Sequence, residues 1–470
     1  MRDLASSNMF WRVGPFLVVT ATAALAFPFI WGNKMLLVAT LAASLLSLGI
    51  SAAARWGIWT CDRFTLLLWW VLVANRALIP RVESVEASHL AWDAPTIAEV
   101  AVTCAVFVSS VLLFLWRVRS LRLKAIPASL KLLALYATAA GGSLLYSPSP
   151  SYSAFWFLRL LSIVILLAVY FASGGDPLRL SRVTAIAAIP YIVLPWLALL
   201  QNRASEGGRV GGYWLHPILV SAIGYAIAVG YLLTWLQKTR KASALILGVF
   251  GLTAAYMAGG KAPAVAMALV LLMVLAANRR VALSARGIAA AVVAALVVML
   301  VAYHADVGLV SHWRVYEESD FGTLRDRILL WQSSIPMWLN FPVLGQGFAS
   351  TKITQLSTPG REWTALHMHN SFLQPLIEVG LLGAIPLCLG VGIVVARTLR
   401  LGGRTFRDRS VGPIASAWYV LLLCGLTDLI FGGSPQPQTC IFYGLLVSLD
   451  ALTRSQTAAY RSWKKPWRPC

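Results

Sequence analysis

The amino-acid sequence predicts an all-α, polytopic integral membrane protein with about 12–14 transmembrane helices. Of its 470 residues, 59% are hydrophobic and only 12% are charged, and the mean hydropathy is +0.73. A soluble domain carries about twice that share of charged residues. Apolar runs follow one another along most of the chain, and one long polar stretch separates the last of them from the rest. The sequence therefore predicts a membrane protein with one large extramembrane loop.

The apolar runs set the expected order of the helices, because each is long enough to cross a bilayer. They are residues 14–31, 35–53, 64–80, 97–116, 125–145, 153–172, 183–200, 216–236, 242–258, 262–277, 287–303, 371–396, 411–431 and 439–452.

These runs divide the chain into four parts. We expect residues 1–303 to form an N-terminal transmembrane bundle of about eleven helices, and residues 371–452 to form the C-terminal transmembrane helices. Residues 304–370 form the long loop between them, which would be the catalytic part. Residues 453–470 form a basic tail at the membrane surface.

The net charge of +21 follows membrane topology and does not indicate a nucleic-acid partner. Most of the basic residues lie in short connectors on one side of the predicted helices, as the positive-inside rule requires. Both termini are then cytoplasmic, and residues 304–370 face outward, into the periplasm of a Gram-negative cell. The six cysteines show no metal-ligand or disulfide spacing and are expected to be small core residues.

The first half of the loop is expected to contain a helix. Arg327 and Trp331 would be neighbours one turn apart on that helix, close to Arg325. Pro336 predicts a kink or an early end. The apolar residues recur at helical spacing and predict a stripe along one face, made of Leu324, Ile328, Trp331, Ile335 and Trp338.

The second half of the loop contains His367, His369, Asn370 and Ser371, directly before the next apolar run. Asn and Ser are good helix N-caps, and the free N–H groups of a first helical turn attract anions. Arginines and histidines at such a place can bind a diphosphate. The alternative is that the arginines only form the solvated side of an amphipathic helix.

Two short outward turns and one charge within a predicted helix are further candidates. Arg209 lies in a glycine-rich turn, and Lys261 begins a helix after Gly259 and Gly260. Lys261 can donate to a phosphate oxygen, or it can simply extend its charge toward the interface. Arg159 lies well inside an apolar run, where a charge is costly and is often functional.

Four motifs in the loop and the run after it resemble the O-antigen ligase and O-antigen polymerase superfamily. They are residues 327–331 (RILLW), 341–347 (FPVLGQG), 367–373 (HMHNSFL) and 378–383 (EVGLLG). The resemblance implies a fold like that of GT-C-type membrane glycosyltransferases, in the bacterial inner membrane. It implies an undecaprenyl-diphosphate-linked glycan donor, transferred whole to an acceptor hydroxyl with neither a metal nor another cofactor.

The resemblance also implies roles for individual residues. The family's histidine corresponds to His369, the general base, and its arginine before the tryptophan motif corresponds to Arg327, a diphosphate ligand. Lys261 stands where the family usually has arginine, and lysine lacks the two-pronged guanidinium. Arg325 and Arg209 join these as diphosphate-binding candidates. Trp331, Asn370 and Glu378 are supporting candidates.

Several alternatives remain open at this point. His367 competes with His369 as the base, and a zinc site is disfavoured because the sequence offers no obvious third and fourth ligands. A ligase would use lipid A core as the acceptor, and a polymerase would use a glycan repeat unit. A transporter or flippase of the lipid-linked oligosaccharide is the main alternative class, although no internal repeat supports it. A structural scaffold would leave the Arg/His motifs unexplained.

Overall fold

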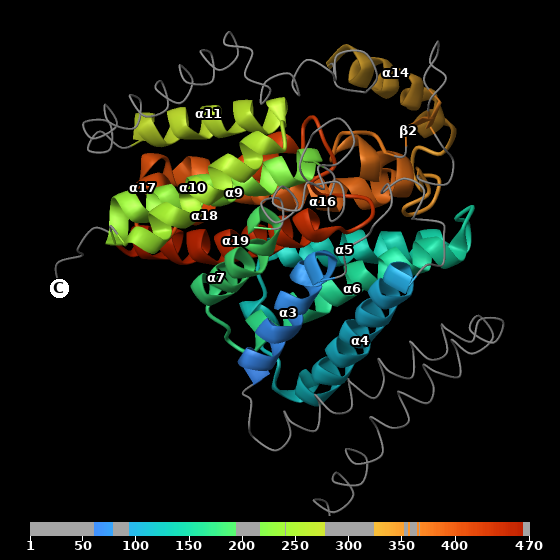
Figure 1. Cartoon of the computed structure of the whole chain (residues 1–470). Helices are drawn as coiled ribbons and strands as arrows, with labels where there is room; N and C mark the ends of the chain where they lie inside the picture. Colours follow the sequence, from blue (N-terminus) through green and yellow to red (C-terminus); the bar gives the residue numbers. More distant parts are fainter. Residues whose placement is uncertain are drawn as a thin grey trace, which may run out of the picture.

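The computed structural model describes most of the chain between residues 61 and 463 (Figure 1). The predicted runs 14–31, 35–53 and 287–303, and the turn with Arg209, lie outside the described residues. The described ranges are 61–78, 94–193, 217–239, 241–277, 324–351, 356–357, 364–365 and 367–463.

The described part confirms an all-α polytopic membrane protein. Five of its helices are long and apolar enough to cross a membrane, namely α4 (Ala94–Arg117), α5 (Ala128–Gly142), α6 (Pro150–Ala172), α9 (Pro217–Thr234) and α16 (Leu373–Leu401). Three shorter apolar helices accompany them, namely α10 (Ala242–Met257), α11 (Lys261–Ala277) and α18 (Gly412–Cys424).

The remaining described helices are less uniformly apolar. They are α3 (Cys61–Leu78), α7 (Pro177–Ala188), α14 (Leu324–Asn340), α17 (Gly403–Arg407) and α19 (Pro437–Trp463). The π-helical turn Trp235–Thr239 extends α9, and three single 3₁₀ turns cover Val118–Ser120, Leu123–Ala125 and Ser143–Leu145. The short strands β1 (Leu356–Ser357) and β2 (Thr364–Ala365) pair antiparallel, Leu356 opposite Ala365.

The helices pack closely where small residues meet. α9 and α10 lie side by side (Figure 1), and a Cβ on Gly224 would stand 2.7 Å from the carbonyl oxygen of Gly251. Such contacts let two backbones approach in a membrane, where apolar side chains gain little by leaving lipid. α5 packs along α16, and α18 packs on α9.

The bundle has two distinct ends. α11 finishes beside α17, where Arg407 Nε donates to the carbonyl of Ala277, and α18 begins next to Phe406 of α17. The first residue of α11 and the last of α18 therefore lie at the opposite end. The connectors with Arg117, Arg119, Arg122 and Lys124 lie at the end where α6 finishes, because Arg122 N donates to Ala172 O.

α16 is broken at Gly380, and the broken turn binds the loop that follows α14. Gly380 has φ +60°, outside the helical range. The break frees backbone groups that residues 342–347 satisfy: Gln346 N donates to Ile377 O (2.9 Å), Gly347 N to Glu378 O (2.8 Å), and Leu381 N to Pro342 O (2.9 Å). The FPVLGQG and EVGLLG motifs are thus two sides of one backbone-to-backbone junction.

The predicted run 411–431 is wrong at its second half. α18 ends at Cys424, and residues 425–436 form an irregular segment before α19. Most of the segment is buried although it is not helical, with Leu426 as its exposed residue. It packs against residues 370–375, and Gly433 lies beside Glu378. Burial among protein groups gave it the same apolar composition as a membrane span.

α14 forms at the predicted helical spacing, so its apolar stripe lies along one side of the helix, but that side is not wholly turned toward the bundle. Trp331 and Trp338 are half-buried toward the bundle, whereas Ile328 and Ile335 are exposed. Pro336 does not end the helix, which continues to Asn340. Both faces of α14 are therefore apolar in part.

Arg159 is fully buried and joins three helices. Its Nη1 lies 2.8 Å from Glu99 Oε1, and Arg76 Nε lies 3.3 Å from the same oxygen. The Glu99 carboxylate on α4 thus pairs with Arg159 on α6 and with Arg76 on α3. The arrangement joins these three helices, and among the described residues it pairs two arginines with one carboxylate.

Candidate active site

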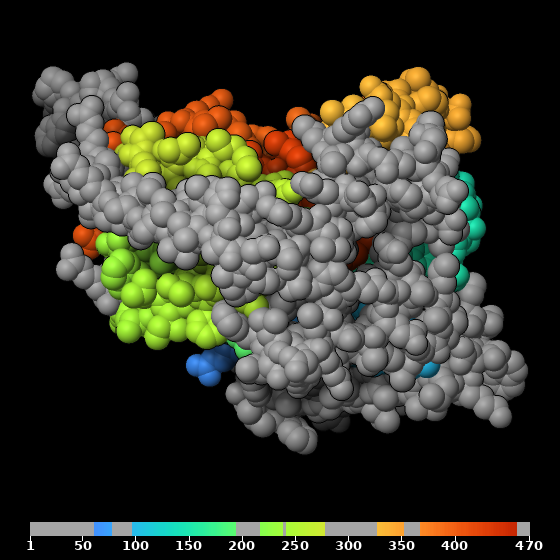
Figure 2. All heavy atoms as spheres, turned by 45° about the horizontal axis from the view of Figure 1, so that its top comes forward, coloured from blue at the N-terminus to red at the C-terminus, as the bar shows by residue number. Residues whose placement is uncertain are grey.

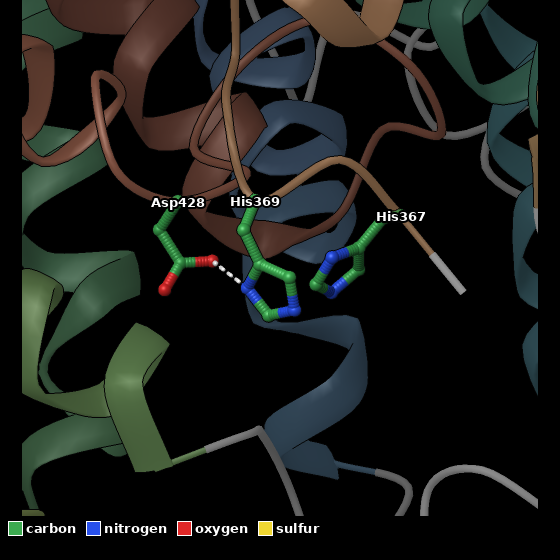
Figure 3. Close-up of side chains that lie close together, drawn as sticks. All are labelled: His367, His369 and Asp428. Atoms are coloured by element: carbon green, nitrogen blue, oxygen red, sulfur yellow. Dashed lines mark ion pairs between the residues drawn. The ribbon is translucent and has the colours of Figure 1, made fainter. Parts of the chain in front are cut away.

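His367, His369 and Asp428 meet at the end of the bundle that holds the end of α18 (Figure 3). Nδ1 of His369 lies 3.6 Å from Oδ1 of Asp428. The two imidazole rings stand edge to face, with centroids 4.1 Å apart and an interplanar angle of 73°. The histidines come from the segment before α16 and the aspartate from the segment after α18, so the fold joins positions 59 residues apart or more.

Asp428 is buried and is surrounded by positive groups. Arg327 Nη2 lies 3.9 Å from its Oδ2, and Leu429 N donates to its Oδ1 at 2.8 Å. Burial alone would raise the pKa of the Asp428 carboxyl. The contact with His369 and the charges of His369, Arg327 and His367 outweigh that burial and hold the pKa well below its usual range. Asp428 is therefore a fixed negative charge facing His369.

Two side chains of the HMHNSFL motif attach it to the segment that carries Asp428. Ser371 Oγ donates to Asp428 O (2.9 Å) and accepts from Ile430 N (2.8 Å), while Ser371 N donates to Gly425 O (2.8 Å). Asn370 Nδ2 donates to Leu426 O (2.9 Å). These bonds explain why Asn and Ser follow His369: they fix the distance between histidine and aspartate.

Asn370 is not the N-cap residue of α16, a position that Phe372 holds, but its side chain bonds the turn that leads into the helix. Its Oδ1 accepts from Phe372 N at 2.9 Å and from Leu373 N at 3.0 Å, which satisfies two donors that the first helical turn leaves open. The Asn370 side chain thus bonds both the turn that leads into α16 and the segment after α18.

His369 itself has a backbone conformation that non-glycine residues rarely adopt, with φ +46°. The neighbouring Met368 is held on both sides, because Trp331 Nε1 donates to its carbonyl (2.8 Å) and its N–H donates to Gln374 Oε1 (2.8 Å). These fixed neighbours maintain the strained turn and aim the imidazole at Asp428.

Glu378 lies behind the histidines in a buried polar network. Its Oε1 accepts from Thr351 Oγ1 (2.8 Å) and from Gln374 Nε2 (2.6 Å), and the same Gln374 holds Met368. Glu378 therefore connects the broken turn of α16 to the turn that carries His369. The supporting role that the sequence suggested for Glu378 stays a prediction.

Arg327 is buried on the inner face of α14. It donates through Nη1 to Thr427 O and faces Asp428 through Nη2. The structure thus brings Arg327 to the histidine site, but as a partner of Asp428. This position is one that sequence spacing could not show.

The other candidate cations are placed less closely. Lys261 is exposed as the first residue of α11, at the same end of the bundle as the end of α18. Arg325 lies in the first turn of α14, and its side chain is outside the described part, as is Arg209. Within the described part, the structure brings Arg327 and the two histidines together at Asp428. Asn370 bonds the segment that carries Asp428, whereas Trp331 and Glu378 are linked to the histidine turn through Met368 and Gln374.

Asp428 is the functional candidate that the sequence reasoning missed. It stands in an apolar stretch that hydropathy assigned to a membrane span, so it was not weighed as a site residue. A signal was present, since Gly432, Gly433 and Pro435 follow it closely and a carboxylate is costly in a span. Together these features indicate an irregular segment.

The same three side chains could also hold a metal ion by geometry. His367, His369 and Asp428 each offer one ligand atom, all within 4.8 Å of one another, which supplies the third ligand that the sequence did not reveal. Arg327 argues against a cation here, because its guanidinium already lies beside the Asp428 carboxylate. Arginine and a divalent ion would compete for one negative charge.

Comparison with known families agrees with the resemblance seen in the motifs. Residues 244–388 match the family model described as O-antigen ligase. This range includes most of α10, all of α11 and α14, and the HMHNSFL motif, and it supports the O-antigen ligase and polymerase superfamily. Asp428 lies beyond the matched range. Among curated proteins, none matches the chain.

Proposed function

Since residues 244–388 match the family model described as O-antigen ligase, we propose that this protein is a membrane glycosyltransferase. It transfers a glycan as one unit from undecaprenyl diphosphate to an acceptor hydroxyl at the periplasmic face of the bacterial inner membrane. The observation that carries the proposal is the His369–Asp428 pair, set beside Arg327 at one end of the bundle. The basic connectors near Arg122 lie at the opposite end, which favours a cytoplasmic position for them.

In the proposed reaction, His369 acts as the general base. Asp428 faces Nδ1, which favours the tautomer with the proton there and leaves Nε2 to accept the proton of the acceptor hydroxyl. The hydroxyl oxygen forms a bond to the anomeric carbon of the donor glycan. The bond from that carbon to the diphosphate oxygen breaks, and its electron pair leaves with undecaprenyl diphosphate.

The leaving diphosphate gains negative charge, which fixed cations stabilise. Arg327 and His369 face the same Asp428 carboxylate, and Arg327 serves first by holding that carboxylate in place. Lys261, Arg325 and Arg209 complete the proposed diphosphate-binding set. The mechanism gives no step to a metal or other cofactor.

The acceptor remains one of two kinds within this proposal. A ligase would use a sugar hydroxyl of lipid A core, and a polymerase would use a repeat unit of O-antigen or exopolysaccharide. Both need the same base and the same leaving group.

The test uses a deletion strain complemented with the wild-type gene, His369→Gln or His367→Gln. Surface glycans are separated on a gel, and lipid-linked glycans are extracted and measured. We expect wild type to restore the surface glycan. We expect His369→Gln to reduce transfer about 10²–10⁴-fold, because it removes the base. His367→Gln should have the smaller effect, because in the structure it is His369 whose Nδ1 faces Asp428.

The pool that accumulates identifies the reaction. Long chains on undecaprenyl diphosphate with bare lipid A core indicate a ligase, whereas single repeats or no polymer indicate a polymerase. Full transfer by a well-expressed His369→Gln variant would refute the assignment of the base. If the variant instead stopped the lipid-linked glycan from reaching the periplasm, the transporter reading would replace the enzyme.

A further inference from the structure

The outward face of α14 is apolar although it does not pack on the bundle. Ile328, Ile335 and Leu339 are 41%, 49% and 59% exposed. The opposite face of the same helix carries Arg327 and Leu330, which are buried. A helix between protein and water would place polar residues on its outward face. Among the described side chains of α14, the exposed polar ones are Gln332 and Asn340.

The turn that follows α14 continues this apolar surface. Phe341, Val343 and Leu344 are 57%, 55% and 50% exposed. Figure 2 shows the amber side chains of this part of the chain standing at the surface of the molecule. A patch of this kind on a protein marks a site that binds an apolar partner.

The partner is indicated by the surface that the patch joins. α16 is a membrane-crossing helix by length and composition, and Leu382, Ile385 and Leu389 form an exposed row along it at spacings of three and four. A helix that crosses a bilayer turns an exposed apolar row of this kind toward lipid. Leu382 N donates to Val343 O at 3.1 Å, so the turn after α14 lies directly beside its first member. The lipid-facing surface of α16 therefore continues onto the turn and α14.

We propose that α14 and the turn after it are embedded in the membrane leaflet on the side of the histidine site, with Ile335, Leu339 and Val343 in contact with acyl chains. α14 is then an interfacial helix that lies in the leaflet without crossing it. The half-buried Trp338, whose Nε1 donates to Pro342 O at 3.2 Å, is a residue type that favours this depth.

The proposed position of α14 differs from the sequence prediction, which placed the whole loop 304–370 on the aqueous side. One face of α14 contacts lipid while the other holds Arg327 against Asp428. The wall between the bilayer and the histidine site is thus one helix thick. The inference stands on exposure and packing and does not depend on the proposed reaction.

The experiment measures what surrounds the exposed side chains. Full-length protein carries a single ketone-bearing amino acid at Leu339 or Val343, which is coupled to a nitroxide without involving the native cysteines. Each labelled protein is placed as one copy per lipid nanodisc, and collision rates with oxygen and with a water-soluble nickel chelate are measured. Leu389 on α16 is the lipid control, and Ser120 in the exposed connector after α4 is the water control.

We expect Leu339 and Val343 to resemble Leu389, with oxygen collisions exceeding nickel-chelate collisions and the reverse at Ser120. Two positions are used so that one poorly folding variant does not decide the result, and melting temperatures confirm folding. Nickel-chelate collisions as frequent as at Ser120 would place α14 in water and overturn the proposal. Exclusion of both reagents would overturn it too, because another protein surface would then cover the patch.

Discussion

Gly345 and Gly380 meet backbone to backbone where α16 breaks, and this contact fixes the loop before the histidine site. A Cβ on Gly380 would lie 2.3 Å from Val343 O, and one on Gly345 would lie 2.5 Å from Gly380 N. Both glycines have positive φ, +72° at Gly345 and +60° at Gly380. The two motifs that they belong to are therefore coupled by geometry.

Gly380→Ala should separate this junction. The added methyl group collides with a backbone carbonyl, and alanine at this φ costs about 1–3 kcal/mol in strain alone. We expect a clear fall in melting temperature in detergent, together with loss of transfer. Gly392→Ala on the same helix is the matched control, because nothing lies within 4 Å of its Cβ position. Equal melting temperatures for the two variants would contradict the junction.

The helical framework could be predicted from the sequence because hydropathy responds to local composition. The turn at Gly259 and Lys261, for example, was expected between runs 242–258 and 262–277, and α10 and α11 occupy Ala242–Met257 and Lys261–Ala277. The bonds that Asn370 Oδ1 accepts from the turn leading into α16 are equally local. Such features depend only on neighbours in the chain.

The sequence predicted the histidines of the candidate site but not Asp428, because the contact between Asp428 and His369 is long-range. The HMHNSFL motif gave the histidines, but Asp428 reaches His369 only through packing of the segment after α18. Hydropathy cannot distinguish burial in lipid from burial among protein groups, so that segment was assigned to a span. Helical spacing likewise predicts the stripe of α14 but not its surroundings, since Ile328 is exposed and Trp331 is half-buried.

Asp428→Asn should reduce transfer while preserving the fold. The amide keeps an oxygen to accept from Leu429 N but loses the charge that faces His369. We expect the transfer rate to fall by about 10²–10⁴-fold, which is the usual contribution of a positioned proton-transfer group to the rate. Transfer is measured in membranes containing equal amounts of each variant, with melting temperature as the control. A rate within twofold of wild type would show that the carboxylate does not act on the base.

The depressed pKa of Asp428 also predicts how the wild type responds to acid. Because the folded pKa lies below the unfolded value of about 3.9, the ionised carboxylate stabilises the fold fully above that pH. The contribution is lost as the pH falls through the folded pKa. We therefore expect Asp428→Asn to melt with a weaker pH dependence than wild type below about pH 4. Parallel pH curves for both proteins would contradict this prediction.

Chelation should leave the proposed reaction unchanged. Washed membranes are treated with EDTA, and transfer is measured before and after adding Zn²⁺ or Mg²⁺ back. We expect equal rates, because the guanidinium of Arg327 already neutralises the Asp428 carboxylate that a metal cation would need as a ligand. If EDTA abolished transfer and Zn²⁺ restored it, His367, His369 and Asp428 would be a metal site instead.

The buried cluster of Arg76, Glu99 and Arg159 should be sensitive to loss of its only described carboxylate. Glu99→Gln leaves two arginines buried with no negative partner in the cluster, and breaking a buried pair in this way costs about 3–5 kcal/mol. We expect a large fall in melting temperature, and a smaller one for Glu99→Asp, which keeps the charge on a shorter side chain. Adding Arg159→Gln to Glu99→Gln removes one uncompensated charge and should recover part of the loss. If Glu99→Gln instead melted like the wild type, the cluster would not hold α3, α4 and α6 together through charge.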